Sequence, residues 1–96
     1  MPTPTKLSDA DVTAELTSTE GWSLTGGKLH REFTFADFVE AFGFMSSAAL
    51  VAERMGHHPE WFNVYSTVKV DLNTHDAGGI TALDFELARA MSKLAG

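Results

Sequence analysis

Alternating apolar and polar positions predict two short strands near the start of the chain. Residues 28–35 alternate in this way, and Phe33 and Phe35 mark the face that we expect to be buried. Residues 22–25 form a second, shorter strand candidate. The Gly26-Gly27 pair lies between the two segments and predicts a tight hairpin, because the turns that suit hairpins need positive φ angles.

A longer segment, residues 62–72, also alternates between apolar and polar positions, which predicts further strand. A bulge or kink within 63–66 would split this segment into two strands. The even positions are mostly apolar, so we expect them to face the core: Phe62, Val64, Ser66, Val68, Val70 and Leu72. The odd positions include the polar residues Asn63, Thr67, Lys69 and Asp71.

Helical spacing of apolar residues predicts three helices. The first covers about 9–17, with Ser8 as its capping residue. The longest covers 37–55 and ends at Gly56, a residue that suits the left-handed conformation at a helix end. The last helix begins after Thr81 and continues to about residue 94.

The 37–55 helix carries two apolar stripes, which predicts that both a sheet and a second subunit pack on it. One stripe contains Phe38, Phe42, Met45, Ala49 and Ala52, and the other contains Phe44, Ala48, Val51 and Met55. In the last helix, one face gathers Ile80, Leu83, Leu87, Ala90, Met91 and Leu94. We therefore expect a homo-oligomer, either a homodimer or a homotetramer.

The order of the predicted elements is helix, two strands, helix, one long or two short strands, helix. Hairpin strands with helices on one face form an α+β two-layer sandwich, here with an antiparallel sheet of about four strands. The 96 residues contain no internal repeat, low-complexity tract or linker. We expect residues 1–96 to form a single domain.

Composition excludes several classes of protein. The chain has no cysteine, which excludes disulfides, thiolate nucleophiles and zinc–cysteine sites and fits a reducing compartment. Its net charge is −6, and its seven Lys and Arg residues are scattered, which argues against direct binding to nucleic acid. No apolar stretch approaches the roughly 20 residues that span a membrane, and residues 1–7 do not resemble a signal peptide. We therefore expect a cytoplasmic protein.

Three of the four histidines lie where the sequence predicts breaks between elements. His57 and His58 follow the end of the long helix, and Pro59 disfavours helical conformation at His58, so the pair leaves along an extended path. His75 lies in a glycine-flanked loop. Attraction to the helix dipole would explain one histidine at a helix end, but not two. Histidine both donates and accepts protons near neutral pH, which makes this group a candidate for proton transfer, whereas we expect His30 to be a surface residue.

Two alternatives apply to neighbouring residues. A metal site could combine Glu53 and His57 with His58 or His75, but Gly56 interrupts the helix between the first two and no known zinc spacing is present. We therefore expect no metal. In the last helix, Thr81-x-x-Asp84 is a capping box, so Asp84 could serve the helix alone.

The spacing of these residues resembles that of the pterin-4a-carbinolamine dehydratase family. The resemblance consists of Glu53, three residues, His57-His58-Pro59, five residues, Tyr65, nine residues, His75, eight residues, and then Asp84. Segments 41–45, 57–65 and 74–75 are also similar to that family. The likeness extends over roughly residues 20–95.

The resemblance implies an enzyme that removes water from a 4a-hydroxytetrahydropterin, giving a quinonoid dihydropterin for tetrahydropterin recycling. Family members work without metal or prosthetic group and form dimers or tetramers. Animal members also bind a homeodomain transcription factor, and nothing in this sequence supports transferring that role. A non-catalytic module that assists a partner protein, and a pocket that serves another pterin pathway, are the alternatives.

The resemblance also implies a role for each candidate residue. His57 and His75 would be the acid/base pair, and His58 would bind and orient the pterin. Three further residues would polarise the histidines, bind the ring edge or supply an aromatic wall: Glu53, Asp84 and Trp61. Gly56 and Leu83 depart from the animal form, which has an acidic residue and an arginine at these positions.

Overall fold

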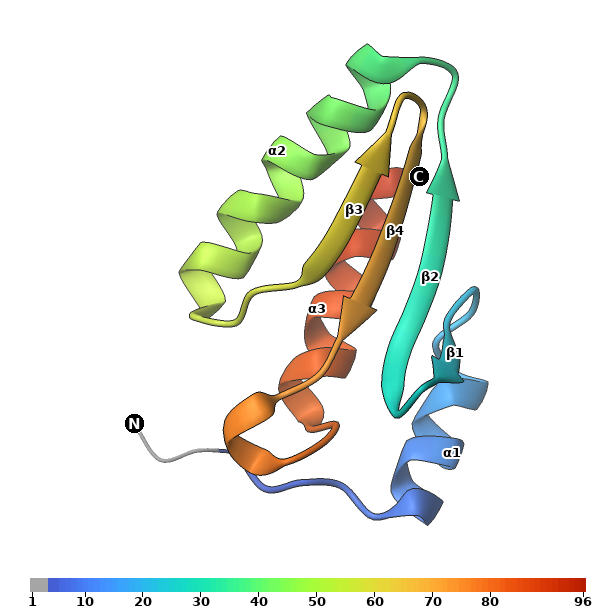
Figure 1. The fold of residues 1–96 in the computed structure, drawn as a ribbon. Coiled ribbons are helices and arrows are strands. Elements are labelled where there is room, and N and C mark those ends of the chain that lie inside the picture. The colour runs from blue at the N-terminus through green and yellow to red at the C-terminus, as the bar shows by residue number, and fades with distance from the viewer. Residues whose placement is uncertain (1–3) are drawn as a thin grey trace.

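A computed structural model describes residues 4–96, which form an antiparallel sheet of four strands with helices on one side (Figure 1). The strands are β1 (Ser23–Thr25), β2 (Lys28–Thr34), β3 (Glu60–Val64) and β4 (Thr67–Leu72). The helices are α1 (Asp9–Thr17), α2 (Phe38–Met55) and α3 (Ala82–Ala95), with a short 3-10 turn, η1 (His75–Ala77). The spatial order of the strands is β1-β2-β4-β3.

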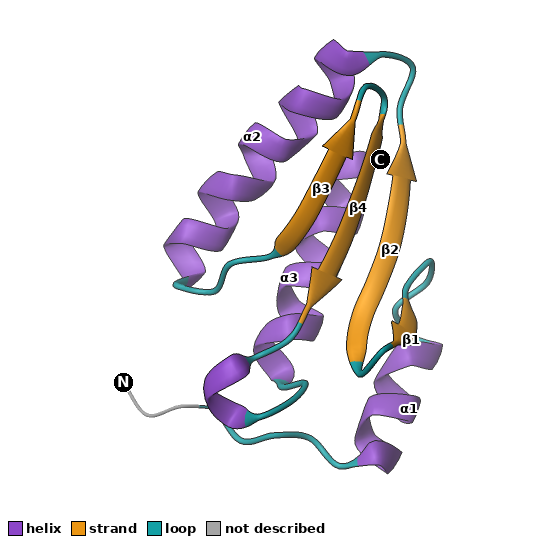
Figure 2. Cartoon of the chain, viewed as in Figure 1, coloured by secondary structure: helices purple, strands orange, loops and turns teal. Residues whose placement is uncertain are grey.

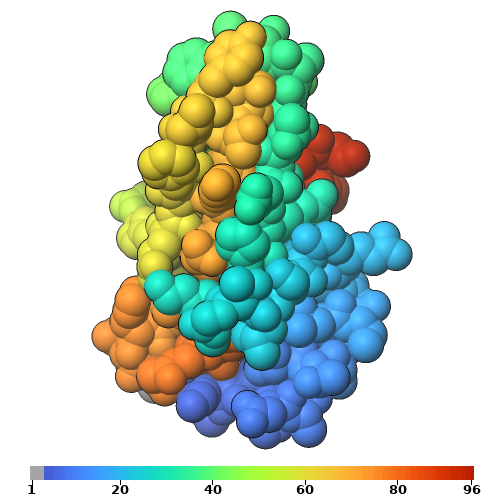
Figure 3. Space-filling view, turned by 45° about the vertical axis from the view of Figure 1, so that its right-hand side comes forward, coloured from blue at the N-terminus to red at the C-terminus, as the bar shows by residue number. Residues whose placement is uncertain are grey.

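Figures 1 and 2 show α3 behind the sheet and α2 running alongside β3. Helix α2 contacts both α3 and β4, and this arrangement of helices on an antiparallel sheet confirms the predicted α+β architecture. The side chains of Leu29, Val70 and Leu72 point to that side and are fully buried against the helices. Among residues 4–96, no helix covers the opposite face of the sheet, and side chains of β2, β4 and β3 form the surface there, as Figure 3 shows. Within the described part of the chain, no helix is both long and apolar enough to cross a membrane.

The element boundaries follow from local hydrogen bonds. Ser8 caps α1, and the Asp37 carboxylate caps α2 by accepting a bond from the Glu40 N–H at 2.9 Å. Gly56 ends α2 in the left-handed conformation, with φ of 66°. Thr81 caps α3 in a complete capping box. The three predicted helices are thus confirmed in place and extent.

The hairpin prediction at Gly26-Gly27 is also confirmed. The two glycines have φ angles of 60° and 78°, values that other residues rarely adopt, and they connect β1 to β2. In β2, Leu29 and Phe33 pair with Leu72 and Val68 of β4 on the core face, as the alternation predicts.

The structure corrects the burial predicted for residues 62–72. Tyr65 (φ of 51°) and Ser66 form a tight turn, and Val64 pairs with Thr67 across it. Residues paired across two strands share a face of the sheet, and here even-numbered residues of β3 pair with odd-numbered residues of β4. The buried positions are therefore even-numbered in β4 but odd-numbered in β3. Phe62 and Val64 therefore face outward, 59% and 57% exposed, and the prediction that they are buried was wrong. Trp61 occupies the core side instead, opposite Val70.

The apolar stripes of the helices are buried only in part. In α2 the buried positions combine members of both predicted stripes with Ala41: Ala41, Phe44, Ala48 and Ala52. Phe38 and Phe42 stay exposed, together with Val39 and Leu50. In α3, Phe85 and Ala88 are buried, whereas the predicted Leu94 is exposed. Helices α2 and α3 each pack against both the sheet and the other helix. The residues buried by these two contacts therefore differ in part from the apolar stripe read from the sequence.

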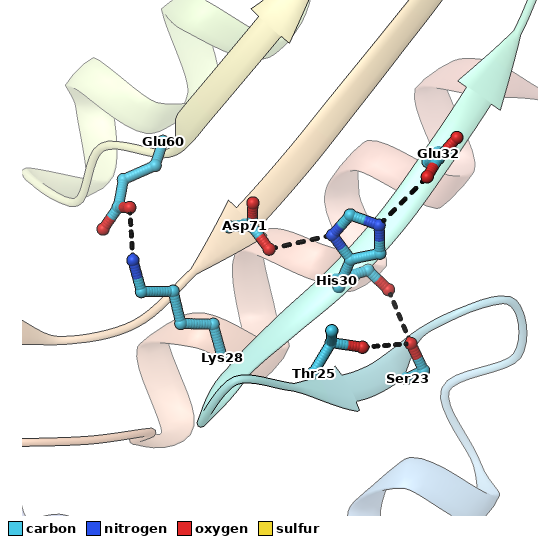
Figure 4. A network of polar contacts seen from close by, with 7 residues as sticks. All are labelled: Ser23, Thr25, Lys28, His30, Glu32, Glu60 and Asp71. Atoms are coloured by element: carbon cyan, nitrogen blue, oxygen red, sulfur yellow. Dashed lines mark hydrogen bonds and ion pairs between the residues drawn. The ribbon is translucent and has the colours of Figure 1, made fainter.

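His30 belongs to a network of charged groups on the uncovered face of the sheet (Figure 4). Its Nδ1 lies 2.8 Å from an Asp71 oxygen and its Nε2 lies 3.4 Å from a Glu32 oxygen. The bond to Asp71 is the main reason that the pKa of His30 is raised above its ordinary value. His30 thus lies on the surface, as expected, but its ring is fixed by two carboxylates.

Two glycines of α2 give stability predictions of opposite sign. In residues 4–96, apart from the adjoining residues and the nearby backbone of the helix itself, no atom lies within 4 Å of a Cβ placed on Gly43 or Gly56. Gly56→Ala forces alanine into the left-handed region and should lower the free energy of unfolding by about 1 kcal/mol. Gly43→Ala, in the helix interior, should raise it by roughly 0.5–1 kcal/mol. Urea unfolding measures both changes, and equal signs would contradict the assignment of Gly56 as the left-handed cap.

Candidate functional site

One end of the sheet brings together segments that are far apart in the sequence. Helix α2 and strand β4 both run toward this end, while β3 and α3 both start from it (Figure 1). The α2–β3 connection therefore lies beside the segment that leads from β4 through η1 to α3. The predicted histidines lie on these two connections.

The end of α2 fixes the backbone of His57. Its N–H donates to the carbonyl of Ala52 at 3.0 Å, and the N–H of Gly56 donates to the carbonyl of Glu53 at 3.1 Å. Together these bonds form a Schellman motif, which turns the chain sharply out of the helix. The side chain of His57 consequently points inward and is only 9% exposed.

The imidazole of His57 is paired with the buried carboxylate of Asp84. His57 Nε2 lies 2.5 Å from Asp84 Oδ1, and since a carboxylate only accepts, Nε2 donates. The other oxygen, Oδ2, accepts bonds from the N–H of Thr81 and the hydroxyl of Thr74, each at 2.9 Å. Asp84 is fully buried. It therefore completes the capping box of α3 and holds His57 as well, so the two sequence interpretations of this residue are compatible.

The three predicted histidines line one hollow of about 250 Å³. Its walls come from the two connections at this end of the sheet: Gly56, His57, His58, Asn73, Thr74, His75 and Asp76. The side-chain oxygen of Asn73 is buried and accepts no hydrogen bond within the described residues. A buried acceptor without a donor costs free energy. The wall of the hollow thus contains one unsatisfied hydrogen-bond acceptor beside the histidines.

Each histidine of the hollow contacts a carboxylate through Nε2. His58 Nε2 lies 2.7 Å from Glu53 of α2, and His75 Nε2 lies 3.0 Å from Glu60 of β3. Unlike the buried His57 pair, these two pairs are open to solvent. No bond to Nδ1 of any of the three rings occurs within residues 4–96. That nitrogen is the one left to exchange a proton with a bound molecule.

Glu60 and Lys28 are members of this constellation that sequence reasoning missed. The Glu60 carboxylate also accepts a bond from Lys28 Nζ at 2.6 Å. This bond is the main reason that the pKa of Glu60 is lowered, and the contact with His75 adds to the effect. Lys28 is 32 residues away in sequence, so only the pairing of strands could reveal the contact.

Four residues named from the sequence do not line the hollow: Glu53, Trp61, Tyr65 and Asp84. Glu53 and Asp84 still contact its histidines through hydrogen bonds, whereas the other two lie elsewhere. Trp61 faces the core side of β3 and packs against the buried cluster. Tyr65 forms the turn between β3 and β4, at the other end of the hairpin (Figure 1). No set of three His, Asp or Glu side chains among residues 4–96 is arranged to hold a metal ion.

A larger hollow, of about 580 Å³, lies at the end of α1. It contains two arginines and several hydroxyl side chains but no histidine: Thr17, Ser18, Thr19, Glu20, Gly21, Arg31, Arg89 and Ser92. The site with paired acid/base groups is therefore the smaller one.

Comparison with known proteins gives the same family for nearly the whole chain. Residues 5–94 match the family model described as pterin 4 alpha carbinolamine dehydratase. A protein of Solibacter usitatus (strain Ellin6076), provisionally named pterin-4-alpha-carbinolamine dehydratase, is 58% identical over 91 residues, which cover 95% of this chain and 96% of that protein. A similarly named protein of Rhizobium johnstonii is 60% identical over 92 residues, or 94% and 91% of the two chains.

Two solved structures resemble the fold. The crystal structure of a transcriptional coactivator/pterin dehydratase from Brucella melitensis has a TM-score of 0.92 and 45% identity, covering 95% of this chain and 99% of that one. A pterin dehydratase-like protein identified as a RuBisCO assembly factor in the alpha-carboxysome has a TM-score of 0.69, with 80% and 92% coverage. At 22% identity, that second structure shares the fold alone.

The dual role of Asp84 predicts different outcomes for two substitutions. Asp84→Ala leaves the Thr81 N–H and the Thr74 hydroxyl without their acceptor and should destabilise the fold by about 2–3 kcal/mol. Asp84→Asn keeps an acceptor for them but presents an N–H to His57, which should move the imidazole hydrogen from Nε2 to Nδ1. Nitrogen-15 NMR of the histidines reads the tautomer directly. An unchanged His57 tautomer in Asp84→Asn would contradict the pairing.

Proposed function

Because this chain belongs to the pterin-4-alpha-carbinolamine dehydratase family, we propose that it dehydrates a 4a-hydroxytetrahydropterin to a quinonoid dihydropterin. The observation that carries the proposal is the hollow where three histidines meet, each backed by a carboxylate. The whole chain acts as one dehydratase domain.

The reaction needs two proton transfers. The 4a-hydroxyl leaves as water after it receives a proton, and a proton leaves N5 as the C4a=N5 double bond forms. Two imidazoles on either side of the ring can perform both transfers without a metal. The substrate supplies all the electrons that rearrange, so the reaction requires no redox partner.

In this proposal His57 is the base. With its Nε2 hydrogen donated to Asp84, its Nδ1 has a free lone pair for the N5 proton, and the buried carboxylate stabilises the imidazolium that results. His75 is the acid, since it lies on the open side of the hollow, where water can leave. His58, paired with Glu53, binds and orients the ring.

A second candidate function is a binding module that assists a partner protein without catalysis. The structural resemblance to a RuBisCO assembly factor favours it, since that protein has the same fold and a role in assembly. The histidine–carboxylate pairs favour the enzyme, because a docking surface has no need of three paired proton-transfer groups around one hollow.

Self-association is also part of the proposal. The outer side of α2 exposes four large apolar residues: Phe38, Val39, Phe42 and Leu50. Phe38 and Phe42 contact each other, with ring centroids 5.7 Å apart. An apolar surface of this kind on a small domain is typical of an interface, and we propose that a second copy of the chain covers it. The proposed setting is the cytoplasm, in the recycling of tetrahydropterin.

The catalytic proposal is tested by removing each imidazole. His57→Ala and His75→Ala should each lower the dehydration rate of a chemically prepared 4a-hydroxytetrahydropterin by about 10²-fold or more, the scale of lost acid/base catalysis. His30→Ala is the matched control, because it removes an imidazole from the sheet face outside the hollow and should keep the rate. An inactive wild-type protein that is folded would favour the binding module instead.

The interface proposal is tested by a charge on the exposed side of α2. Phe42→Glu should shift the mass in light scattering toward that of a monomer, because a carboxylate cannot be buried there without a partner. Leu24→Glu is the control, since Leu24 is an exposed apolar residue of β1, away from α2. A monomeric wild-type protein at micromolar concentration would refute the interface.

A further inference from the structure

The orientation of His75 depends on very few contacts. The ring lies on the single turn of η1, and its side chain is 75% exposed. Among residues 4–96, the hydrogen bond to Glu60 Oε2 at 3.0 Å is the only one made by the ring. A side chain so exposed samples several rotamers unless a partner holds it. Glu60 is therefore the hydrogen-bond partner of this ring within the described residues.

Glu60 is itself held in place by two elements. It is the first residue of β3, where it pairs with Asp71 of β4 in the sheet register. Its Oε1 accepts the bond from Lys28 Nζ at the start of β2, as Figure 4 shows, while Oε2 contacts His75. Each carboxylate oxygen thus has one partner, and the contacts Lys28–Glu60–His75 connect the sheet to the exposed ring of His75.

The charged groups around Glu60 favour its ionised form. Lys28 lowers the pKa of Glu60, chiefly through their hydrogen bond, and Glu60 raises the pKa of Lys28 in return. From β4, Asp71 also favours the charged form of Lys28. His75 shares its hollow with three other titratable groups, from the α2–β3 connection and η1: His57, His58 and Asp76. Glu60 is the carboxylate that contacts the His75 ring, and it is an acceptor throughout the neutral range.

We propose that Glu60, fixed by Lys28, is a positioning residue for His75: its carboxylate accepts the Nε2 hydrogen, so that Nδ1, which carries the proton to be donated when the ring is an imidazolium, is directed toward the substrate. This inference rests on the proposed function, since it assigns His75 a proton transfer. Exposed ion pairs add little to stability, so the contribution of the pair lies in orientation. Rate depends steeply on the geometry of a proton donor, and a supporting residue that fixes that geometry therefore affects kcat.

Four variants separate positioning from general structure. Glu60→Ala removes the acceptor, Lys28→Met removes the cation that holds it, and Lys28→Arg restores a cation. Glu32→Ala is the control, because it removes a carboxylate of the same sheet face that contacts His30 and not His75. The midpoint of urea unfolding should stay the same in all four.

The first measurement does not depend on activity. Nitrogen-15 NMR of neutral His75 should show mainly the Nε2–H tautomer in the wild type and in Glu32→Ala, and a mixture in Glu60→Ala. In Lys28→Met the pKa of Glu60, followed by carbon-13 NMR of its carboxyl, should rise toward its ordinary value, because its main stabilising partner is lost. An unchanged His75 tautomer in Glu60→Ala would overturn the proposal.

The second measurement is kinetic. Glu60→Ala should lower kcat about 10-fold, less than removal of His75 itself, with a smaller change in KM. Lys28→Met should lower kcat by a smaller factor, and Lys28→Arg should restore it. If the wild type is active and Glu60→Ala keeps full kcat, the positioning role fails while the proposed function stands. If the wild type is inactive, the proposed function fails and the NMR result alone decides whether Glu60 positions His75.

Discussion

The structure depends on one buried carboxylate, that of Asp84. A buried charge costs several kcal/mol unless it is fully paired, and here three donors share it: the N–H of Thr81, the hydroxyl of Thr74 and Nε2 of His57. These donors come from the start of α3, the segment after β4 and the segment after α2. The same carboxylate therefore joins three parts of the chain and fixes the ring that we propose as the catalytic base.

Burial differs among the three histidine–carboxylate pairs, and the difference matches their proposed tasks. The His57–Asp84 pair is almost inaccessible, which fixes the tautomer and leaves one nitrogen for the hollow. The pairs of His58 with Glu53 and of His75 with Glu60 are open to solvent. Open pairs allow a substrate to enter and water to leave, but they hold their rings less firmly. A second anchor, such as Lys28 on Glu60, compensates for that looseness.

The fold by itself does not determine the activity. A structure with a TM-score of 0.69 to this chain belongs to a protein identified as a RuBisCO assembly factor, and at 22% identity the two share the fold alone. The feature on which the proposed enzymatic function rests is the set of paired titratable groups at the end of the sheet. The exposed apolar residues of α2 are a separate feature of the molecule and are compatible with either function.

Local chemistry made much of this protein predictable from its sequence. Helix caps at Asp37 and Thr81, the left-handed Gly56 and the Gly26-Gly27 hairpin all arise from hydrogen bonds between near neighbours, which a sequence displays directly. Resemblance to a known family also grouped the histidines and Asp84 as one candidate site. Tertiary structure alone decided the contacts that cross between elements. The turn at Tyr65 reversed the faces of Phe62 and Val64, and the sheet register placed Lys28 beside Glu60, 32 residues away. Such contacts depend on how strands pair, and the periodicity of one strand does not specify its partner's register.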